Sequence, residues 1–214
     1  MRAIAWRLTC NRAEVMNAET RLIVVTGGPG AGKTAALEVI RRDANSHVVV
    51  LPEAAGIVFG GGFPRSSTSV GQRAAQRAIF RVQRELERLA IEEGGARVVL
   101  CDRGTLDGVA YWPGTQEEFF RDVESSLEAE LARYSLVIHL KTPAAHHGYS
   151  HENPLRIETA RQAAEIDARI ARVWSTHPRV VTVECRARFL DKLHAVIQAI
   201  RSELPTDRAE GAVA

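Results

Sequence analysis

The sequence predicts one α/β domain in which a five-stranded parallel sheet lies between two layers of helices, a three-layer αβα sandwich. Two observations lead to this prediction. Short apolar runs alternate with longer stretches of helical periodicity, which is the pattern of successive βαβ units. The chain has 214 residues, of which 45% are hydrophobic and 25% charged, the length and balance of a single globular domain.

Five short apolar runs are the predicted strands, and each is uninterrupted, as expected for a parallel sheet that is buried on both faces. They cover residues 22–26, 47–51, 97–101, 136–140 and 180–184. The segments between and after them carry helical signals, and we predict helices over residues 33–42, 70–93, 116–133, 155–174 and 190–204. The Gly- and Ser-rich segment 59–69 is predicted to be a mobile loop.

We expect the folded domain to cover residues 21–204, with a lid at about 143–161, between a flexible extension (1–20) and a flexible tail (205–214). Whether the first 18 residues belong to the native protein is left open. The sequence has no apolar run of 18 residues and no signal-peptide core, and its three cysteines form no CxxC pair, so we expect a cytoplasmic protein with reduced thiols.

The charge balance argues against nucleic acid as a partner. Lys and Arg number 28 and Asp and Glu 26, and a net charge of +2 offers little attraction to a polyanion. The clustered His146, His147 and His151 lack a cysteine or carboxylate at ligand spacing, so they do not favour a metal site. Only three of the basic residues are lysines, namely Lys33, Lys141 and Lys192.

One of these lysines completes a phosphate-binding motif. Residues 27–34 read GGPGAGKT, which matches GxxxxGK[ST] between a predicted strand and a predicted helix. The loop would wrap N–H groups around phosphate oxygens, Lys33 would reach the β- and γ-phosphates, and the Thr34 hydroxyl would hold Mg²⁺. We therefore predict ATP and Mg²⁺ as cofactors, with the nucleotide bound by Gly28, Gly30, Ala31, Gly32, Lys33 and Thr34.

Two carboxylates follow neighbouring strands and should meet this loop, because parallel strands point their carboxyl ends to one edge. Asp102 follows the third strand, in the position where P-loop proteins place a carboxylate that supports Mg²⁺. The alternative interpretation is that Asp102 lies in a turn and caps the next helix. Glu53 follows the second strand and could accept the proton of an attacking hydroxyl, or it could simply favour a helix N-terminus.

Arginines near the predicted lid are candidates for stabilising the transferred phosphoryl group. Arg156 and Arg161 lie at the start of the penultimate helix, where closure of the lid would bring positive charge to the developing negative charge. Asp102 is followed by Arg103, not by the glutamate of ring-forming motor ATPases, and the guanine-reading NKxD motif is absent. Both observations argue against a motor and against a Ras-like switch GTPase.

With these residues in view, the chain resembles a bacterial group of P-loop proteins with AAA-type domains. That group is related to the ribosylnicotinamide kinase of NAD metabolism and to a eukaryotic GTP-binding protein of photoreceptor trafficking; thymidylate and deoxynucleoside kinases are wider relatives. The resemblance rests on segments 25–34, 52–53, 102–112, 134–140 and 153–158. It implies a P-loop NTPase fold of the nucleotide-kinase type, with Glu53 as base, Asp102 as magnesium carboxylate and Arg103 as a phosphate or substrate contact.

The leading hypothesis is an ATP-dependent kinase for a small hydroxyl-bearing acceptor, nucleoside-like or a related metabolite. Its pocket would be formed by residues 59–65, the helix 70–93 and the loop 102–112, with possible acceptor contacts from Arg65, Arg73, Tyr111 and Trp112. The alternatives are a nucleotide-dependent binding or regulatory ATPase or GTPase, and a polynucleotide 5′-hydroxyl kinase, which the near-neutral charge disfavours. The identity of the acceptor, the choice of ATP or GTP and the oligomeric state are left open.

Overall fold

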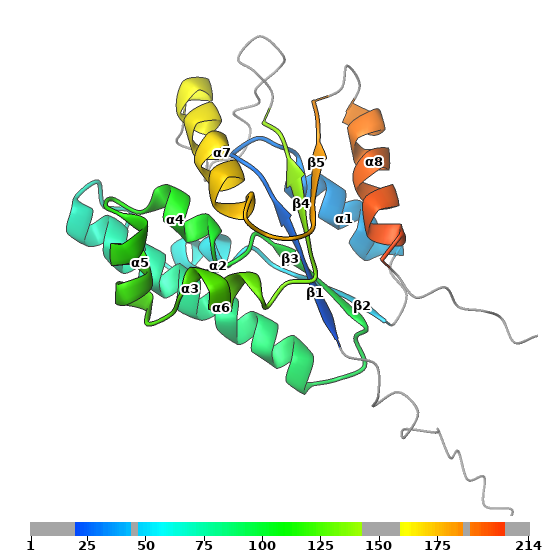
Figure 1. The fold of residues 1–214 in the computed structure, drawn as a ribbon, viewed down its shortest axis with the longest axis horizontal. Helices are drawn as coiled ribbons and strands as arrows, with labels where there is room; N and C mark the ends of the chain where they lie inside the picture. Colours follow the sequence, from blue (N-terminus) through cyan, green and yellow to red (C-terminus); the bar gives the residue numbers. More distant parts are fainter. Residues whose placement is uncertain (1–19, 44–46, 143–158, 186–188, 204–214) are drawn as a thin grey trace, which may run out of the picture.

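A computed structural model describes residues 20–43, 47–142, 159–185 and 189–203. In this part of the chain, five strands form one parallel sheet in the order β2-β3-β1-β4-β5 (Figure 1). The strands are β1 (Arg21–Thr26), β2 (Val48–Leu51), β3 (Val98–Asp102), β4 (Leu136–Leu140) and β5 (Val180–Val183). Every predicted strand is therefore present, and its ends lie within one residue of those expected.

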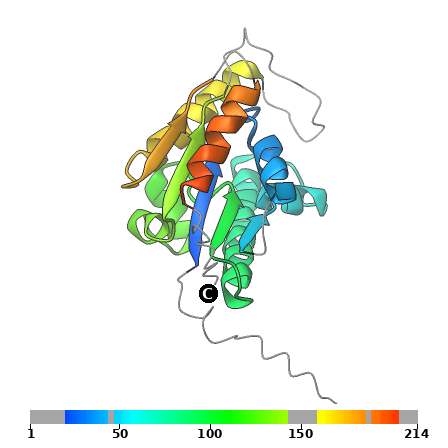
Figure 2. The ribbon, with the colours of Figure 1, turned by 90° about the vertical axis from the view of Figure 1, so that its right-hand side faces the viewer.

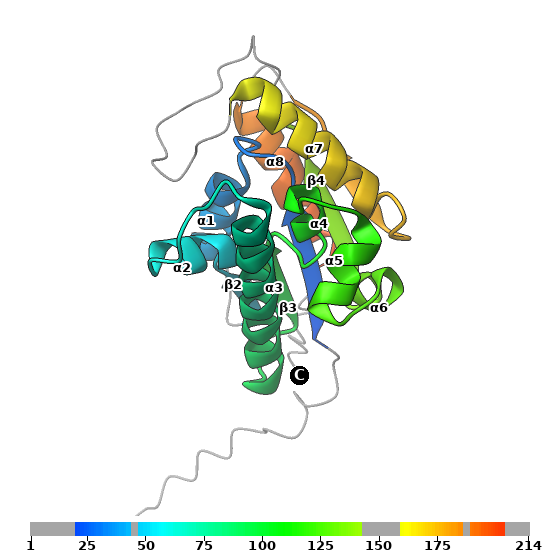
Figure 3. The ribbon, with the colours of Figure 1, turned by 90° about the vertical axis from the view of Figure 1, so that its left-hand side faces the viewer.

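Helices cover both faces of the sheet, so the predicted three-layer sandwich is confirmed. The first face carries α1 (Lys33–Asp43) and α8 (Phe189–Arg201), which Figure 2 shows in front of the sheet. The opposite face, seen in Figure 3, is covered by α3 (Ser69–Glu92), α4 (Asp107–Tyr111), α5 (Gln116–Val123), α6 (Leu127–Leu131) and α7 (Ala160–Trp174). The short helix α2 (Ala54–Gly60) packs against α3.

The central strand β1 shows how the sequence produces these layers. Its side chains alternate between the two faces, as the two-residue period of a strand requires. Leu22 and Val24 belong to the core beneath α3 and α7, whereas Ile23 and Val25 belong to the core beneath α1 and α8. All four are at most 4% exposed, which explains why the run is apolar throughout.

The strand order places a ligand-binding crevice between β1 and β3. The connection that leaves β1 runs through α1 on one face, and the connection that leaves β3 runs through α4, α5 and α6 on the other. Neighbouring strands whose connections diverge in this way form a topological switch point, and ligands of open α/β sheets bind there, at the carboxyl ends of the strands.

The helix predicted over 116–133 is wrong as a single element, because the chain breaks between α5 and α6. Glu124 ends α5 in the left-handed conformation, with φ 57° and ψ 50°. The Ser126 hydroxyl then accepts a hydrogen bond from the N–H of Ala129 and caps α6. Serine is a preferred N-cap residue, so Ser126 could have indicated in the sequence that a second helix begins here.

Other differences from the predicted elements concern the short helices and one helix start. Helix α2 includes two residues of the predicted loop 59–69, and Ser69 already begins α3; helix α4 was not predicted. Helix α7 begins at Ala160, where Thr159 and Gln162 form a capping box, and residues 155–158 of the predicted helix lie outside the described residues. Within the described part of the chain, no helix combines the length and hydrophobicity that a membrane crossing requires.

Candidate active site

The glycine-rich loop runs from the end of β1 to the start of α1, as predicted. Three of its glycines, Gly27, Gly30 and Gly32, have φ angles of 136°, 80° and 92°, a region that other residues rarely adopt. At Gly27 the reason is also steric, since a Cβ atom would lie 2.1 Å from the carbonyl oxygen of Leu140 on β4. The loop can therefore turn sharply at the sheet edge only with glycine at this position.

Lys33 is buried beneath this loop. Its Nζ donates hydrogen bonds to the carbonyl oxygens of Gly27 (2.8 Å) and Gly28 (3.0 Å). Burial lowers the pKa of Lys33 to about 8, and the nearby positive charge of Arg103 adds to this effect, while Asp102, Glu53 and Asp107 oppose it. The ammonium is thus a poorly solvated cation, which gains most from a phosphate group that replaces its present weak partners.

The carboxyl end of β3 brings Asp102 to the first turn of α1. The Thr34 hydroxyl lies 3.5 Å from Oδ2 of Asp102, and Oδ1 is buried without a hydrogen-bond partner among the described residues. Burial raises the pKa of Asp102, although Lys33 opposes the shift. An unpartnered carboxylate oxygen beside a hydroxyl fits Mg²⁺, which is usually held by one or two protein oxygens together with phosphates and water.

Glu53 forms an ion pair with Arg103 across the crevice. Although Glu53 is the N-cap residue of α2, its side chain caps no backbone N–H; instead it accepts a hydrogen bond from Nε of Arg103 at 2.7 Å. Burial alone would raise the pKa of Glu53, but the attraction and hydrogen bond of Arg103, with the charges of Lys33 and Arg65, bring it below the usual value. Glu53 is therefore an ionised carboxylate at neutral pH.

Arg103 itself is held in a strained backbone conformation, with φ 74°. Besides Glu53, its guanidinium reaches the carbonyl oxygen of Gly27 at 3.3 Å and Oδ2 of Asp107 at 3.4 Å. It also lies 5.7 Å from the ring centre of Tyr111. These contacts from three segments offset the backbone strain and direct the guanidinium to the phosphate-binding loop.

A cleft of about 650 Å³ opens in front of these residues and has two differently built halves. The first, which we call the P-loop half, is lined by residues 29–35. The second, which we call the α2–α3 half, is lined by Glu53, by residues of α2 and α3, and by residues within the segments 65–66 and 103–111. Lys33, Glu53 and Arg103 all line this cleft, so the structure brings three of the predicted site residues together.

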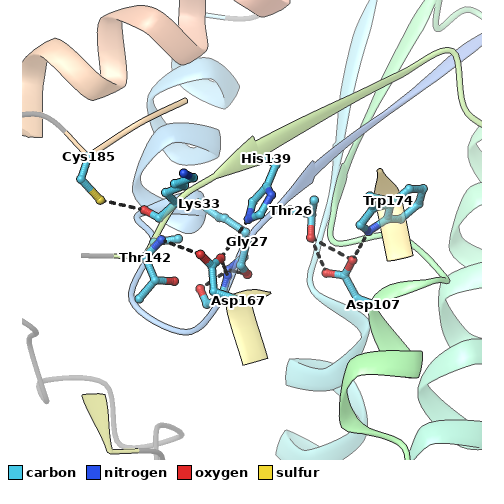
Figure 4. A network of polar contacts seen from close by, with 12 residues as sticks. Thr26, Gly27, Lys33, Asp107, His139, Thr142, Asp167, Trp174 and Cys185 are labelled. Carbon is cyan, nitrogen blue, oxygen red and sulfur yellow. Dashed lines mark hydrogen bonds and ion pairs between the residues drawn. The ribbon is translucent and has the colours of Figure 1, made fainter. Parts of the chain in front are cut away.

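Asp107 connects the end of β1 with α7 and Arg103, a role that was not predicted from the sequence. It is 3% exposed and accepts hydrogen bonds from Oγ1 of Thr26 (2.7 and 2.8 Å) and from Nε1 of Trp174 (2.6 Å) (Figure 4). Thr26 is the last residue of β1 and Trp174 the last residue of α7. The carboxylate therefore connects the start of the glycine-rich loop, α7 and Arg103.

Asp167 on α7 holds the outer side of the glycine-rich loop (Figure 4). Its carboxylate accepts hydrogen bonds from the backbone N–H groups of Gly28 (2.7 Å) and Thr142 (3.2 Å) and lies 2.9 Å from Nε2 of His139. It is seven residues before Trp174, about two helical turns, so both lie on one face of α7. In the sequence, the seven-residue spacing between Asp167 and Trp174 is the local feature that could have pointed to Asp167.

The three lysines of the chain all lie around the glycine-rich loop. Lys33 lies inside it, and Nζ of Lys192 on α8 donates hydrogen bonds to the carbonyl oxygens of Ala31 (2.8 Å) and Lys141. Lys141 follows β4 and forms an exposed ion pair with Glu184. The loop is thus supported from α8 as well as from α7.

Of the two predicted lid arginines, the structure describes only Arg161, which does not line the cleft. Arg161 lies on α7, 89% exposed and paired with Glu165, and Arg156 and the three clustered histidines lie outside the described residues. Arg65 and Tyr111 line the cleft as expected, whereas Trp112 packs into the core and Arg73 pairs with Glu118. No cluster of three metal-binding side chains occurs in the described part of the chain.

Comparisons with known proteins agree with this description. Residues 22–191 match a family described as an AAA domain. The structure is similar to that of thymidylate kinase from Candida albicans, with a TM-score of 0.60 and 14% identity over 86% of this chain and 92% of that one. At this identity the similarity shows a shared fold. The sequence matches no curated protein.

Proposed function

The chain belongs to this family of AAA domains, and on that premise we propose that it is a kinase that transfers the γ-phosphoryl group of ATP to a hydroxyl group of a small molecule. The observation that carries the proposal is Glu53, an ionised carboxylate that lines the same cleft as Lys33. A carboxylate in this position could accept the proton of a hydroxyl group that attacks the γ-phosphate.

In the proposed reaction, the acceptor oxygen attacks the γ-phosphorus and the bond to the β–γ bridging oxygen breaks, releasing ADP. The hydroxyl proton passes to Glu53. The N–H groups of the glycine-rich loop and Lys33 would hold the β- and γ-phosphates, and Arg103 would balance the charge that develops on the transferred group. Arg156 and Arg161 keep the role proposed from the sequence, as lid arginines that add charge on closure.

The Glu53–Arg103 pair also defines what kind of base Glu53 can be. Because its pKa is lowered, Glu53 is ionised at neutral pH and would bind the proton of the acceptor only weakly. This suits phosphoryl transfer, whose loose transition state needs an oriented hydroxyl more than an early deprotonation. We therefore expect Glu53 to orient the acceptor and take its proton late.

Thr34 and Asp102 are the residues that would hold Mg²⁺ in this proposal, because one offers a hydroxyl and the other a buried carboxylate oxygen without a partner. The ion would neutralise charge on the β- and γ-phosphates. Asp102 would keep the Thr34 hydroxyl directed toward that position.

The test combines an acceptor panel with Glu53→Gln. Purified protein is incubated with ATP, Mg²⁺ and a panel of nucleosides and sugars, and ADP release above the acceptor-free rate is measured with the phosphorylated product. Glu53→Gln should bind ATP with nearly normal affinity but lose about 10²–10⁴-fold in transfer, the usual contribution of a general base. Glu85→Gln is the matched control, since Glu85 pairs with Arg88 on an exposed face of α3.

Two outcomes would contradict the proposal. If transfer, hydrolysis and ATP affinity fall together in Glu53→Gln, this residue belongs to the nucleotide and metal site and is not the base. If no acceptor is phosphorylated and Glu53→Gln hydrolyses ATP at the same rate as Glu85→Gln, the protein is a nucleotide-dependent binding protein or an NTP hydrolase.

A further inference from the structure

A second lysine is buried against the glycine-rich loop. Lys192, the fourth residue of α8, is only 5% exposed. Its Nζ donates hydrogen bonds to the carbonyl oxygen of Ala31 at 2.8 Å and to that of Lys141. The thiol of Cys185 donates to the same carbonyl of Lys141 at 3.1 Å, and its sulfur lies 4.0 Å from Nζ. Lys192 therefore joins α8 to the loop at Ala31.

The surroundings of Lys192 are unfavourable for a cation. In the described part of the chain, its hydrogen-bond partners are carbonyl oxygens and a sulfur atom, and no carboxylate lies within ion-pair distance of it. Burial lowers the pKa of Lys192 more than its acidic neighbours raise it. The start of a helix also carries a partial positive charge, which disfavours a lysine there. An uncharged residue could anchor α8 at a lower cost in free energy.

The carbonyl group that Lys192 holds belongs to the peptide unit between Ala31 and Gly32. No cis peptide bond occurs among the described residues, so this C=O and the N–H of Gly32 point in opposite directions. The N–H of Gly32 therefore points away from Lys192, and Gly32 lines the cleft. In a P-loop, the N–H groups at the start of the helix are the ones that bind phosphate oxygens.

A cation bound to a peptide carbonyl strengthens the N–H donor at the other end of the same peptide unit. Hydrogen bonds that follow one another in a chain strengthen each other by roughly 10–30%, and a charged partner makes a bond about twice as strong as a neutral one. The ammonium also fixes the plane of the peptide. The N–H of Gly32 is then oriented before a phosphate arrives, so that less free energy is lost on binding.

We propose that Lys192 is a positioning residue of the phosphate site, whose ammonium orients and polarises the Ala31–Gly32 peptide so that the N–H of Gly32 binds a nucleotide phosphate more tightly. The cost of burying this charge is offset when an anion binds on the other side of the peptide. The inference rests on the proposed binding of ATP by the loop. It adds to that site a lysine that lies outside the GxxxxGK[ST] motif.

The test measures binding alone and needs no acceptor. Affinities for ATP and for inorganic tripolyphosphate are determined by calorimetry at one Mg²⁺ concentration. Lys192→Met should lose about 10-fold in affinity for both ligands, because the phosphate chain is the part that the N–H of Gly32 contacts. Lys192→Arg keeps the charge and should stay within about 3-fold of the wild type. Lys192→Gln, which keeps an N–H donor without the charge, replaces Lys192→Met if that variant does not fold.

Lys141→Met is the matched control. It removes an exposed lysine beside the loop but keeps the backbone carbonyl that Lys192 binds, so both affinities should remain close to those of the wild type. A second readout reports on the peptide itself. In the protein without ligand, the amide proton resonance of Gly32 should move upfield in Lys192→Met, since a less polarised N–H is more shielded, and it should stay in place in Lys141→Met.

Three results would contradict this inference, and they are distinguishable. Equal affinities in Lys192→Met and the wild type, or equal losses in Lys192→Met and Lys192→Arg, would show that the charge of Lys192 does not act on the phosphate site. A loss for ATP with unchanged affinity for tripolyphosphate would place the effect at another part of the nucleotide. If the wild-type protein binds neither ligand, the proposed function fails together with the inference.

Discussion

The two halves of the cleft are built in opposite ways. The P-loop half consists of the consecutive residues 29–35, which end the glycine-rich loop and begin α1. The α2–α3 half is assembled from side chains of segments that lie far apart in the sequence, such as Glu53, Gln76 and Arg103. Phosphate recognition is thus a local property of the chain, whereas the wall opposite depends on how the helices pack.

This difference predicts how each half responds to substitution. A local loop with a fixed backbone should lose its ligand when one key side chain is removed, without loss of the fold. A wall assembled from distant segments should lose stability when a residue that joins those segments is changed. Substitutions of Lys33, Asp107 and Asp167 test this contrast.

Lys33→Ala should nearly abolish nucleotide binding and leave the fold intact. Loss of a desolvated, charge-assisted contact costs about 2–5 kcal/mol, or roughly 30- to 5,000-fold in affinity. Calorimetry with ATP would measure the affinity, and Lys141→Ala, which removes an exposed lysine, is the control. Unchanged ATP affinity in folded Lys33→Ala would show that the loop does not bind the nucleotide phosphates.

Asp107→Asn should destabilise the protein by about 1–3 kcal/mol, because an amide cannot accept from Thr26, Trp174 and Arg103 at once and loses the charge that Arg103 requires. Urea unfolding would measure the change. Asp122→Asn is the control, since Asp122 pairs with Arg77 near the surface. If both variants lose the same stability, the contacts of Asp107 with β1, α7 and Arg103 contribute no more than an ordinary ion pair near the surface.

Asp167→Asn should give the smallest effect, about 1 kcal/mol of stability and a fewfold loss of ATP affinity. Burial would raise the pKa of Asp167, but hydrogen bonds from His139 and the N–H groups of Gly28 and Thr142 lower it, so the ionised form is the one that holds the loop. Thermal unfolding with and without ATP would separate the two effects, with exposed Asp191→Asn as control. An identical shift with and without ATP would contradict a role for Asp167 in the loop.

The contrast between the two halves of the cleft also explains which site residues could be predicted from the sequence. Lys33, Asp102 and Glu53 each lie in or directly after a predicted strand or motif, so the parallel sheet alone brings them to one edge. Trp112 and Arg73 were expected at the acceptor pocket from their place in the chain, but the packing of α5 draws Trp112 against Phe119 and pairs Arg73 with Glu118. Their orientation depended on α5, whose contacts are not local.

The fold class, the five strands and the glycine-rich loop could be predicted from the sequence, because they depend on short-range hydrophobic patterns and on the conformational freedom of glycine. The pairing of Glu53 with Arg103 and the connection of β1 to α7 through Asp107 emerge only in the folded molecule. Those contacts join residues many positions apart, and their partners are selected by how helices and strands pack, which no local pattern encodes.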